Sequence, residues 1–533
     1  MGKKFNTQQE HDAYVEEKKK NKTIWGVIMA SSLGTLIEWY DFYIFGSLAV
    51  ILATKFFPAD NPTAAFLSTL ATFAAGFVVR PFGALFFGRL GDIIGRKYTF
   101  LVTLLIMGFS TFLIGCVPSY ETIGYLAPVL VLILRLLQGL ALGGEYGGAA
   151  TYVAEYSQPH RRGYWTSWIQ TTATSGLFIS LIVILVTKTS LTSEEFDSWG
   201  WRIPFWISIL MVGVSYVIRK NMKESPLFAQ AKKEGKTSKN PLKESFGNKF
   251  NFKFVLLALF GAVMGQGVIW YTGQFYAMSF MQKVMNIESA QVDSMMAIAL
   301  FLATPLFVLF GWLSDKVGRK PIMMIGMLLA IIAYRPIYKA MYNSVNIESK
   351  VIADKGLSEK RTAKVHAKIA SDSVLTFHTE KVFTDGTLFK KDSIVHWSAA
   401  APSMVNGKPE APLIKESITV NPDTRWLLVF LVFIQVVFVT MVYGPIAAFL
   451  VEMFPIRIRY TSMSLPYHIG NGIFGGLLPA VATYLVTSGK QSGIAEWYLQ
   501  GLWYPIVVAG VCLVIGTIYL KTKNKSLEEE DTQ

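Results

Sequence analysis

Three ionisable residues, Glu38, Asp41 and Arg135, lie within long apolar stretches of this chain. A charge in such surroundings is costly unless it is paired or hydrated, so each of these residues is a functional candidate. Glu38 and Asp41 are three positions apart, which places them on one face of a helix. A carboxylate in this setting can take up and release a proton, and a guanidinium can hold a carboxylate through two parallel hydrogen bonds.

The depths expected for Asp41 and Arg135 bring them together. With a helical rise of about 1.5 Å per residue, Asp41 lies roughly 24 Å from the inner end of its span, and Arg135 lies roughly 14 Å below the outer end of another. In an apolar core about 30 Å thick, the two side chains can meet in the outer half. We predict that Asp41 carries a transferable proton under the control of Arg135, with a fixed structural ion pair as the alternative. Glu38, roughly one turn deeper, is a second proton site, a substrate contact or a structural residue.

The second half of the chain has no acidic residue deep in an apolar run and offers uncharged polar and aromatic groups instead. Such side chains more often pack or anchor a helix at the membrane interface. Those in 254–281 recur at helical spacing with Gly265, Gly267 and Gly273, a pattern typical of a cavity-lining or broken helix. The candidate substrate contacts from both halves are Arg135, Gln138, Gln266, Trp270, Tyr271, Gln274, Tyr443 and Asn471.

Four further ionisable residues have structural interpretations. Glu145 stands among glycines that allow close helix contact, and we expect it to act as a polar link between helices. Arg80 and Arg202 are expected near span ends, where long basic side chains reach the interface. His468 is expected to be packed and hydrogen-bonded, with a proton relay as the less favoured alternative.

The elements that must position these residues are membrane-spanning helices. Of the 533 residues, 52% are hydrophobic and 16% are charged, whereas a soluble domain carries roughly 25% charged residues. Apolar runs of about twenty residues recur, each long enough to cross a bilayer, where only helices satisfy their own backbone groups. An all-α membrane protein with twelve spans is predicted, at 25–52, 64–87, 98–116, 126–151, 163–188, 201–218, 254–281, 294–311, 321–341, 426–450, 461–486 and 503–520.

Lys and Arg concentrate in the connections on the side of these spans that holds both termini. The short loops of the other side hold Lys55, Lys188, Lys283 and Lys490. This distribution predicts cytoplasmic termini, and the net charge of +14 then reflects loops that face anionic lipid, not nucleic-acid binding. The predicted parts are a cytoplasmic tail (1–24), a six-helix bundle (25–218), a cytoplasmic linker (219–253), a second six-helix bundle (254–520) with an outer insertion (342–425), and a cytoplasmic tail (521–533).

The outer insertion at 342–425 is long and polar. It contains two hairpin turn signals, Asp385-Gly386 and Asn406-Gly407. We predict a small, partly β-structured lid, with a flexible loop as the alternative.

A ten-residue loop pattern occurs twice, six spans apart. It reads GRLGDIIGRK at 88–97 and GWLSDKVGRK at 311–320, and a second repeated pair places Glu155 with Arg162 and Glu452 with Arg459. The repeats indicate a duplicated six-span unit whose halves rock about a central site. Charged groups in such loops can pair in one conformation and separate in another, with anchoring by positive charge as the alternative. The expected gating residues are Gly88, Asp92, Gly95, Arg96, Gly311, Asp315, Gly318 and Arg319.

The doubled loop pattern resembles the signature of the major facilitator superfamily. The segments EWYDFY at 38–43, RPFG at 80–83, 135–148, WGWRIPF at 199–205 and ESP at 224–226 resemble its metabolite:proton symporter family over nearly the whole chain except 342–425. The resemblance implies two pseudo-symmetric six-helix bundles in a bacterial inner membrane and uptake of a small polar metabolite, a carboxylate or zwitterion. Sugar-porter relatives handle the proton with an acid of the first span and an arginine of the fourth, in positions comparable to Asp41 and Arg135. We expect a monomer in the lipid bilayer that is driven by the proton gradient and needs no cofactor.

Other function classes fit the sequence less well. A facilitator or antiporter of the same fold needs no titrating acid, so Glu38 and Asp41 argue against it. A membrane enzyme needs clustered catalytic groups, and Cys116 and Cys512 offer no metal-ligand spacing. The lack of a phosphate-binding loop argues against ATP drive. A non-transporting nutrient sensor remains an alternative function, and the sequence does not identify the metabolite.

Overall fold

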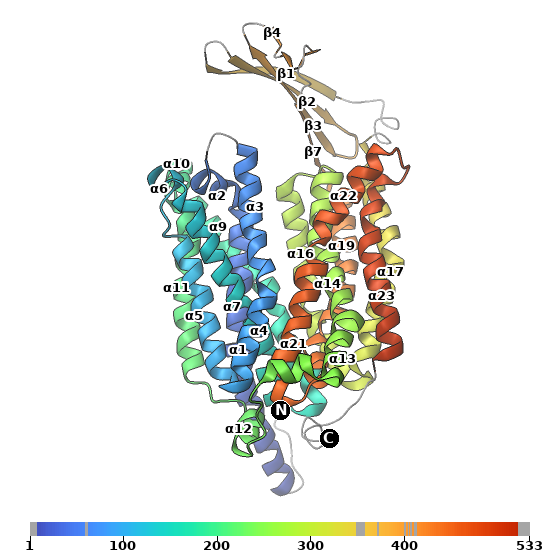
Figure 1. Ribbon diagram of the computed structural model, residues 1–533. Helices are drawn as coiled ribbons and strands as arrows, with labels where there is room; N and C mark the ends of the chain where they lie inside the picture. The colour runs from blue at the N-terminus through green and yellow to red at the C-terminus, as the bar shows by residue number, and fades with distance from the viewer. Residues whose placement is uncertain are drawn as a thin grey trace.

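The computed structural model describes residues 8–58, 62–347, 358–369, 372–398, 401–402, 404–405, 408–409 and 413–520. It shows an all-α membrane fold of twelve spans in two six-helix bundles, which lie side by side in Figure 1. The first half of the chain forms the bundle at the left of that view, and the second half forms the bundle at the right. The fold class expected from the sequence is therefore confirmed.

The N-terminal bundle holds the first six spans. The first two spans are each divided in two, as α1 (Gln8–Ser47) with α2 (Ala49–Phe56) and α3 (Pro62–Val78) with α4 (Arg80–Ile93). The next four are α5 (Arg96–Ile114), α7 (Leu126–Tyr156), α8 (Arg162–Ser167) with α9 (Thr172–Ser190), and α11 (Ile203–Lys220). Three short helices lie outside the spans: α6 (Tyr120–Ile123), α10 (Ser193–Ser198) and α12 (Pro226–Lys233).

The C-terminal bundle holds the last six spans. The seventh span combines α13 (Lys249–Ala258), α14 (Met264–Tyr271) and α15 (Ala277–Ser279) with three π-helical segments, η5 (Leu259–Val263), η6 (Thr272–Tyr276) and η7 (Phe280–Val284). The next three are α16 (Ser289–Val317), α17 (Arg319–Ser344) and α19 (Pro422–Tyr443) with α20 (Ile446–Met453). The last two are α21 (Arg459–Ile469) with η9 (Gly470–Gly475) and α22 (Leu478–Gln491), and then α23 (Trp503–Tyr519).

The second span breaks between α3 and α4. Among the described residues, ten helical runs are long and apolar enough to cross a membrane, and they are the third to twelfth spans. In the second span, Pro81 has no N–H to donate to the carbonyl of Phe77, four residues earlier. Because α4 continues to Ile93, Arg80 lies roughly 20 Å from the other end of α4, in mid-span. Our expectation that Arg80 lies near a span end is therefore wrong.

Glycines bring the second span into backbone contact with α7. A Cβ at Gly139 would collide with the carbonyl oxygen of Gly76, and a Cβ at Gly143 would collide with the carbonyl oxygen of Arg80. Small residues allow helices to approach closely in membranes, where packing and hydrogen bonds replace the hydrophobic effect. The backbone at the Arg80 break is therefore held against α7, the helix that carries Arg135.

The outer insertion forms an antiparallel β-sheet. Its main strands are β1 (Ser358–Ile369), β2 (Asp372–Val382), β3 (Leu388–Ser398) and β7 (Leu413–Thr419), and the short ones are β4 (Ala401–Pro402), β5 (Met404–Val405) and β6 (Lys408–Pro409). The sheet order is β1-β2-β3-β4, with β7 on β3. The predicted hairpin at Asp385-Gly386 is confirmed, since Val382 pairs with Leu388 and Gly386 has φ 84. The second turn signal, Asn406-Gly407, lies outside the described residues.

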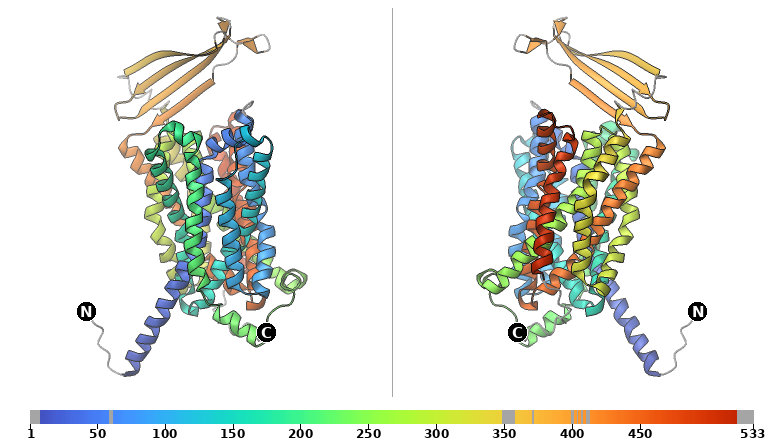
Figure 2. Two further views of the ribbon diagram at one scale, coloured as in Figure 1. Left: turned by 90° about the vertical axis from the view of Figure 1, so that its left-hand side faces the viewer. Right: turned by 90° about the vertical axis from the view of Figure 1, so that its right-hand side faces the viewer.

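The sheet is attached to the C-terminal bundle. The backbone N–H of Ile418 donates to Asn286 O at 2.7 Å, and that of Glu288 donates to Ile418 O at 2.9 Å. Gln291 of α16 exchanges two hydrogen bonds with the backbone of Val420, at 2.8 and 2.9 Å. Figures 1 and 2 show the sheet at one end of the molecule, opposite the end at which α1 begins and α23 finishes.

Candidate functional site

Asp41 and Arg135 form the predicted ion pair. Arg135 Nη1 donates to Asp41 Oδ2 at 2.9 Å, and the same nitrogen donates to Gln138 Oε1. Gln138 Nε2 in turn donates to Thr111 Oγ1 at 2.6 Å, and the Arg135 guanidinium lies 4.1 Å from the centre of the Phe45 ring. Both charged side chains are buried. The contact joins the first span to the fourth, and its role in proton transfer stays a prediction.

A second carboxylate–guanidinium pair lies beside the first. Arg80 Nη1 donates to Glu38 Oε1 at 3.3 Å, and the guanidinium lies 4.3 Å from the centre of the Phe77 ring. The Arg80 side chain is 16% exposed, against 5% for Arg135. Sequence reasoning missed Arg80 as a site residue. The signal that could have found it is Pro81, which breaks the span at this position.

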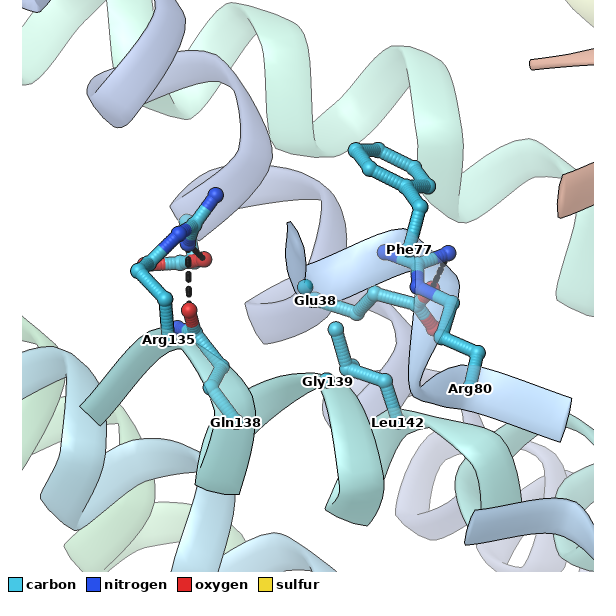
Figure 3. A pocket seen from close by; sticks show the side chains of 9 residues that line it. Glu38, Phe77, Arg80, Arg135, Gln138, Gly139 and Leu142 are labelled. Atoms are coloured by element: carbon cyan, nitrogen blue, oxygen red, sulfur yellow. Dashed lines mark hydrogen bonds and ion pairs between the residues drawn. The ribbon is translucent and has the colours of Figure 1, made fainter. Parts of the chain in front are cut away.

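Both pairs line one pocket between α1, α3, α4 and α7. Its walls are Glu38, Asp41, Gly76, Phe77, Arg80, Arg135, Gln138, Gly139 and Leu142. Figure 3 shows Arg80 and Glu38 on one side of this pocket, and Arg135 with Gln138 on the other. Every residue of the pocket belongs to the N-terminal bundle. Of the predicted substrate contacts, it therefore contains only Arg135 and Gln138.

The candidates of the second half lie in two groups. Trp270 packs against Tyr271 at 4.9 Å and against Tyr443 at 6.4 Å between ring centres. Gln266 and Asn471 exchange two hydrogen bonds between their amides, both at 3.1 Å. Gln274 is buried in η6. The π-helical segments on both sides of α14 make the seventh span irregular, as the glycine pattern led us to expect. Such segments are frequent at functional sites.

Aromatic contacts connect the pocket side of the molecule to the second half. Trp39, next to Glu38 in α1, lies 5.0 Å from Trp270. Tyr146 of α7 stacks on Tyr467 of α21 at 3.7 Å, and the Tyr467 hydroxyl is 2.5 Å from that of Tyr443. Trp39, Tyr146 and Tyr467 were not among the sequence-predicted contacts. Nothing local in the sequence distinguishes them from ordinary packing aromatics.

The repeated loops join the two bundles at the end away from the sheet, which we name the loop end. Asp92 accepts hydrogen bonds from the backbone of Thr461 at 2.9 Å and of Tyr460 at 3.3 Å, at the start of α21. Asp315 accepts from Gly163 at 2.9 Å and Tyr164 at 2.7 Å, at the start of α8. A carboxylate at a helix N-terminus satisfies free N–H groups and the positive end of the dipole. Each loop therefore caps a helix of the other bundle.

Buried ion pairs add to these caps. Glu155 contacts Arg96 at 3.3 Å and Arg459 of the other bundle at 3.2 Å, and all three side chains are fully buried. In the second half, Arg319 contacts Asp315 at 2.5 Å and Glu452 at 3.0 Å.

The loop glycines allow the turns that carry these caps. Gly95 has φ 138 and Gly318 has φ 95, a region of the backbone that strains other residues. Gly88 and Gly311 lie where their loops touch the opposite bundle: a Cβ at Gly88 would lie 2.9 Å from Thr461 Cα, and one at Gly311 would collide with Ser167.

Other charged residues have structural partners. Glu145 Oε1 is 2.5 Å from Arg219 Nη2, and Thr103 donates to Glu145 Oε2 at 2.8 Å, so Glu145 does link helices. Arg219, which we placed at the start of the cytoplasmic linker, is fully buried in α11. Arg202 donates to the carbonyl oxygens of Gly115 and Val117, both at 2.7 Å. His468 is buried.

Comparisons with known proteins place these features in context. The model of the sugar (and other) transporter family matches residues 26–353. The chain is 30% identical to the proline/betaine transporter of Escherichia coli K12, over 94% of this chain and 84% of that one. It is 28% identical to the alpha-ketoglutarate permease of the same strain, over 97% and 98%. The structure of the major facilitator superfamily proton:xylose symporter XylE with bound 6-bromo-6-deoxy-D-glucose superposes with a TM-score of 0.67 at 16% identity, covering 96% of this chain and 99% of that one.

Proposed function

We propose that this chain, which belongs to the sugar (and other) transporter family of the major facilitator superfamily, is a proton-coupled symporter of a small carboxylate. The observation that carries this proposal is the buried pocket with two carboxylate–guanidinium pairs. Intramembrane ionisable residues mark substrate and proton pathways, because their burial is otherwise costly. The family model that matches the chain is one of transporters.

Asp41 is the proposed proton carrier. It has one strong partner, Arg135, and its Oδ1 atom has no hydrogen-bond partner among the described residues. A nearby guanidinium favours the charged carboxylate, and its withdrawal in a dry site favours the protonated form. A rearrangement within the N-terminal bundle that separates Asp41 from Arg135 therefore favours protonation of Asp41. Each tenfold change in the proton affinity of Asp41 corresponds to about 1.4 kcal/mol of coupling free energy between proton and substrate.

The proposed substrate is an anion or zwitterion with a carboxylate. The named relatives carry proline or betaine in one case and alpha-ketoglutarate in the other, and a carboxylate is what these compounds share. A buried guanidinium binds a carboxylate through charge-assisted hydrogen bonds. Aromatic faces such as Trp39 and Trp270 suit the cationic end of a zwitterion. The proposed contacts are Arg135, Gln138, Gln266, Trp270, Tyr271, Gln274, Tyr443 and Asn471.

Uptake into proteoliposomes tests this function. With an inward proton gradient, we expect at least one of proline, glycine betaine, 2-oxoglutarate, citrate and shikimate to accumulate above its equilibrium level, whereas uncharged xylose does not. Collapse of the gradient with a protonophore is expected to abolish accumulation. Equilibration without accumulation would instead identify a facilitator, and binding without any flux would identify a sensor. Accumulation of xylose alone would contradict the carboxylate proposal.

We also propose a monomer in the bacterial inner membrane, with both termini, the linker 219–253 and the loop end in the cytoplasm. The supporting observations are the basic loops of that side and the position of the sheet at the opposite end. Lys236 and Lys415 are exposed on opposite sides of the proposed membrane.

Thiol labelling tests this orientation. In a chain with Cys116→Ser and Cys512→Ala, a membrane-impermeant maleimide should label Lys415→Cys in intact cells with a permeabilised outer membrane. It should label Lys236→Cys only after the inner membrane is opened. Labelling of Lys236→Cys in intact cells, with protection of Lys415→Cys, would invert the orientation.

A further inference from the structure

The two arginines of the pocket differ in their hydrogen bonds and in the exposure of their side chains. Arg135 Nη1 bonds both Asp41 and Gln138, and its side chain is 5% exposed. Arg80 makes one hydrogen bond to Glu38, at 3.3 Å, and its side chain is 16% exposed. A guanidinium has five N–H groups in a planar fork, so Arg80 keeps donors that a planar carboxylate can accept.

The pocket also orients Arg80. Because α4 continues to Ile93, the Arg80 backbone lies in mid-span, and the contact with Gly143 holds that backbone against α7. The guanidinium lies over the Phe77 ring, which further restricts it. Glu38 approaches from α1 with a single oxygen. A ligand that offers two oxygens to the same guanidinium competes well with a single, long hydrogen bond.

We propose that Arg80, in place of Arg135, is the receptor for the substrate carboxylate, that Glu38 occupies it when substrate is absent, and that their exchange drives the proton onto Asp41. This inference rests on the proposed function. The substrate carboxylate displaces Glu38 from Arg80. Glu38 then pairs with Arg135, which lines the same pocket. Asp41 loses its guanidinium partner and takes a proton from water on the open side.

Charges balance in this sequence. Before binding, the pocket holds two guanidinium and two carboxylate groups. After binding, the substrate carboxylate faces Arg80, Glu38 faces Arg135, and Asp41 is neutral. Each buried charge keeps a partner at every stage, as the cost of an unpaired buried charge requires. One carboxylate therefore enters with one proton.

The charged groups that act on Glu38 come from three helices of the N-terminal bundle. Its own helix adds Asp41, α4 adds Arg80, and α7 adds Glu145. Tyr146 of α7 also faces it, as do Tyr271, Tyr443 and Tyr467 across the interface. His468 of α21 lies close to Arg80. Among the described residues that line the pocket, Arg135 is the other cation, and in the proposed exchange it pairs with Glu38 once Arg80 is taken.

Calorimetric titration of the full-length protein in detergent tests the inference. The probes are proline, glycine betaine, 2-oxoglutarate and citrate, each measured in two buffers with different ionisation enthalpies, which reports protons taken up on binding. We expect wild type to bind at least one probe with uptake of about one proton, and Arg80→Gln to bind it roughly 100-fold more weakly. Glu38→Gln should bind at least as tightly as wild type, because the competitor is gone, but without proton uptake.

Two further variants make the outcomes decisive. Arg80→Gln with Glu38→Gln removes the whole pair, so weak binding by this double variant, with an unchanged circular-dichroism melting curve, cannot come from an unpaired Glu38. Arg89→Gln changes an exposed arginine of the same helix and should behave as wild type. Unchanged affinity in Arg80→Gln, or full proton uptake in Glu38→Gln, would overturn the inference while leaving the proposed function intact. Failure of wild type to bind any probe would remove the proposed substrate class and this inference with it.

Discussion

Replacement of Asp41 by Asn is expected to abolish uphill accumulation while substrate exchange continues. The amide keeps nearly the same shape beside Arg135 but cannot titrate, so it resembles the protonated carboxylate. For one coupled proton, a gradient of one pH unit supports accumulation of up to about tenfold, equivalent to about 1.4 kcal/mol. In proteoliposomes containing Asp41→Asn this ratio should fall to one, and the pH dependence of uptake should disappear. Exchange of internal for external substrate should stay within a few-fold of wild type.

Two comparisons identify the reason for any loss. Asp197→Asn, at an exposed position in α10, is the matched control and should keep full accumulation. Loss of exchange together with accumulation in Asp41→Asn would make Asp41 a substrate or structural residue. Proton-driven accumulation that survives in Asp41→Asn would assign the proton-carrying role to Glu38.

Removal of both loop carboxylates is expected to open the loop end. Asp92 and Asp315 each accept two backbone hydrogen bonds from a helix start in the opposite bundle. Hydrogen bonds to charged groups contribute about 1.5–3 kcal/mol each. Asn retains an acceptor but loses the charge, so a reduction of roughly 1–3 kcal/mol at each site is expected. In the double variant Asp92→Asn, Asp315→Asn the closed population should fall at least tenfold relative to the open one.

Distance measurement between spin labels checks this result. Labels at Arg89→Cys and Arg457→Cys lie on exposed positions of opposite bundles, and their separation should lengthen when both carboxylates are replaced. The chain with Cys116→Ser and Cys512→Ala supplies the background, and Asp197→Asn supplies the control. Each single variant should give an intermediate population. An unchanged distance distribution in the double variant would show that the loops anchor the chain without controlling its conformation.

The contact between Asp41 and Arg135 could be predicted because both residues are rare charges at computable depths in regular helices. The Arg80 contact with Glu38 could not, because hydropathy ends the second span at residue 87, whereas α4 continues to Ile93 and leaves Arg80 in mid-span. Arg219 was missed because its run of basic neighbours resembles a solvated linker. Its partner Glu145 lies far away in the sequence, so no local pattern reveals their contact.

Contacts between the bundles were the least predictable part of the site. The pairing of Trp39 with Trp270 depends on how two separately folded units meet, which no local periodicity records. The hairpin at Asp385-Gly386 was predictable because two adjacent residues determine its turn. The attachment of the sheet through Ile418 and Asn286 was not, because it joins distant segments.

The reciprocal caps at the loop end have the geometry of an isologous interface. Asp92 of the first half binds the start of α21, and Asp315 of the second half binds the start of α8, as residue i meets j and j meets i in a twofold dimer. A six-span ancestor that paired with its own copy would have made both contacts with one set of residues. In a fused chain, the residues of the two halves can differ. The two caps are alike, while the buried acids and arginines of the pocket are found in the first half alone among the residues that line it. The second half contributes aromatic rings and amides. Two identical subunits could not differ in this way.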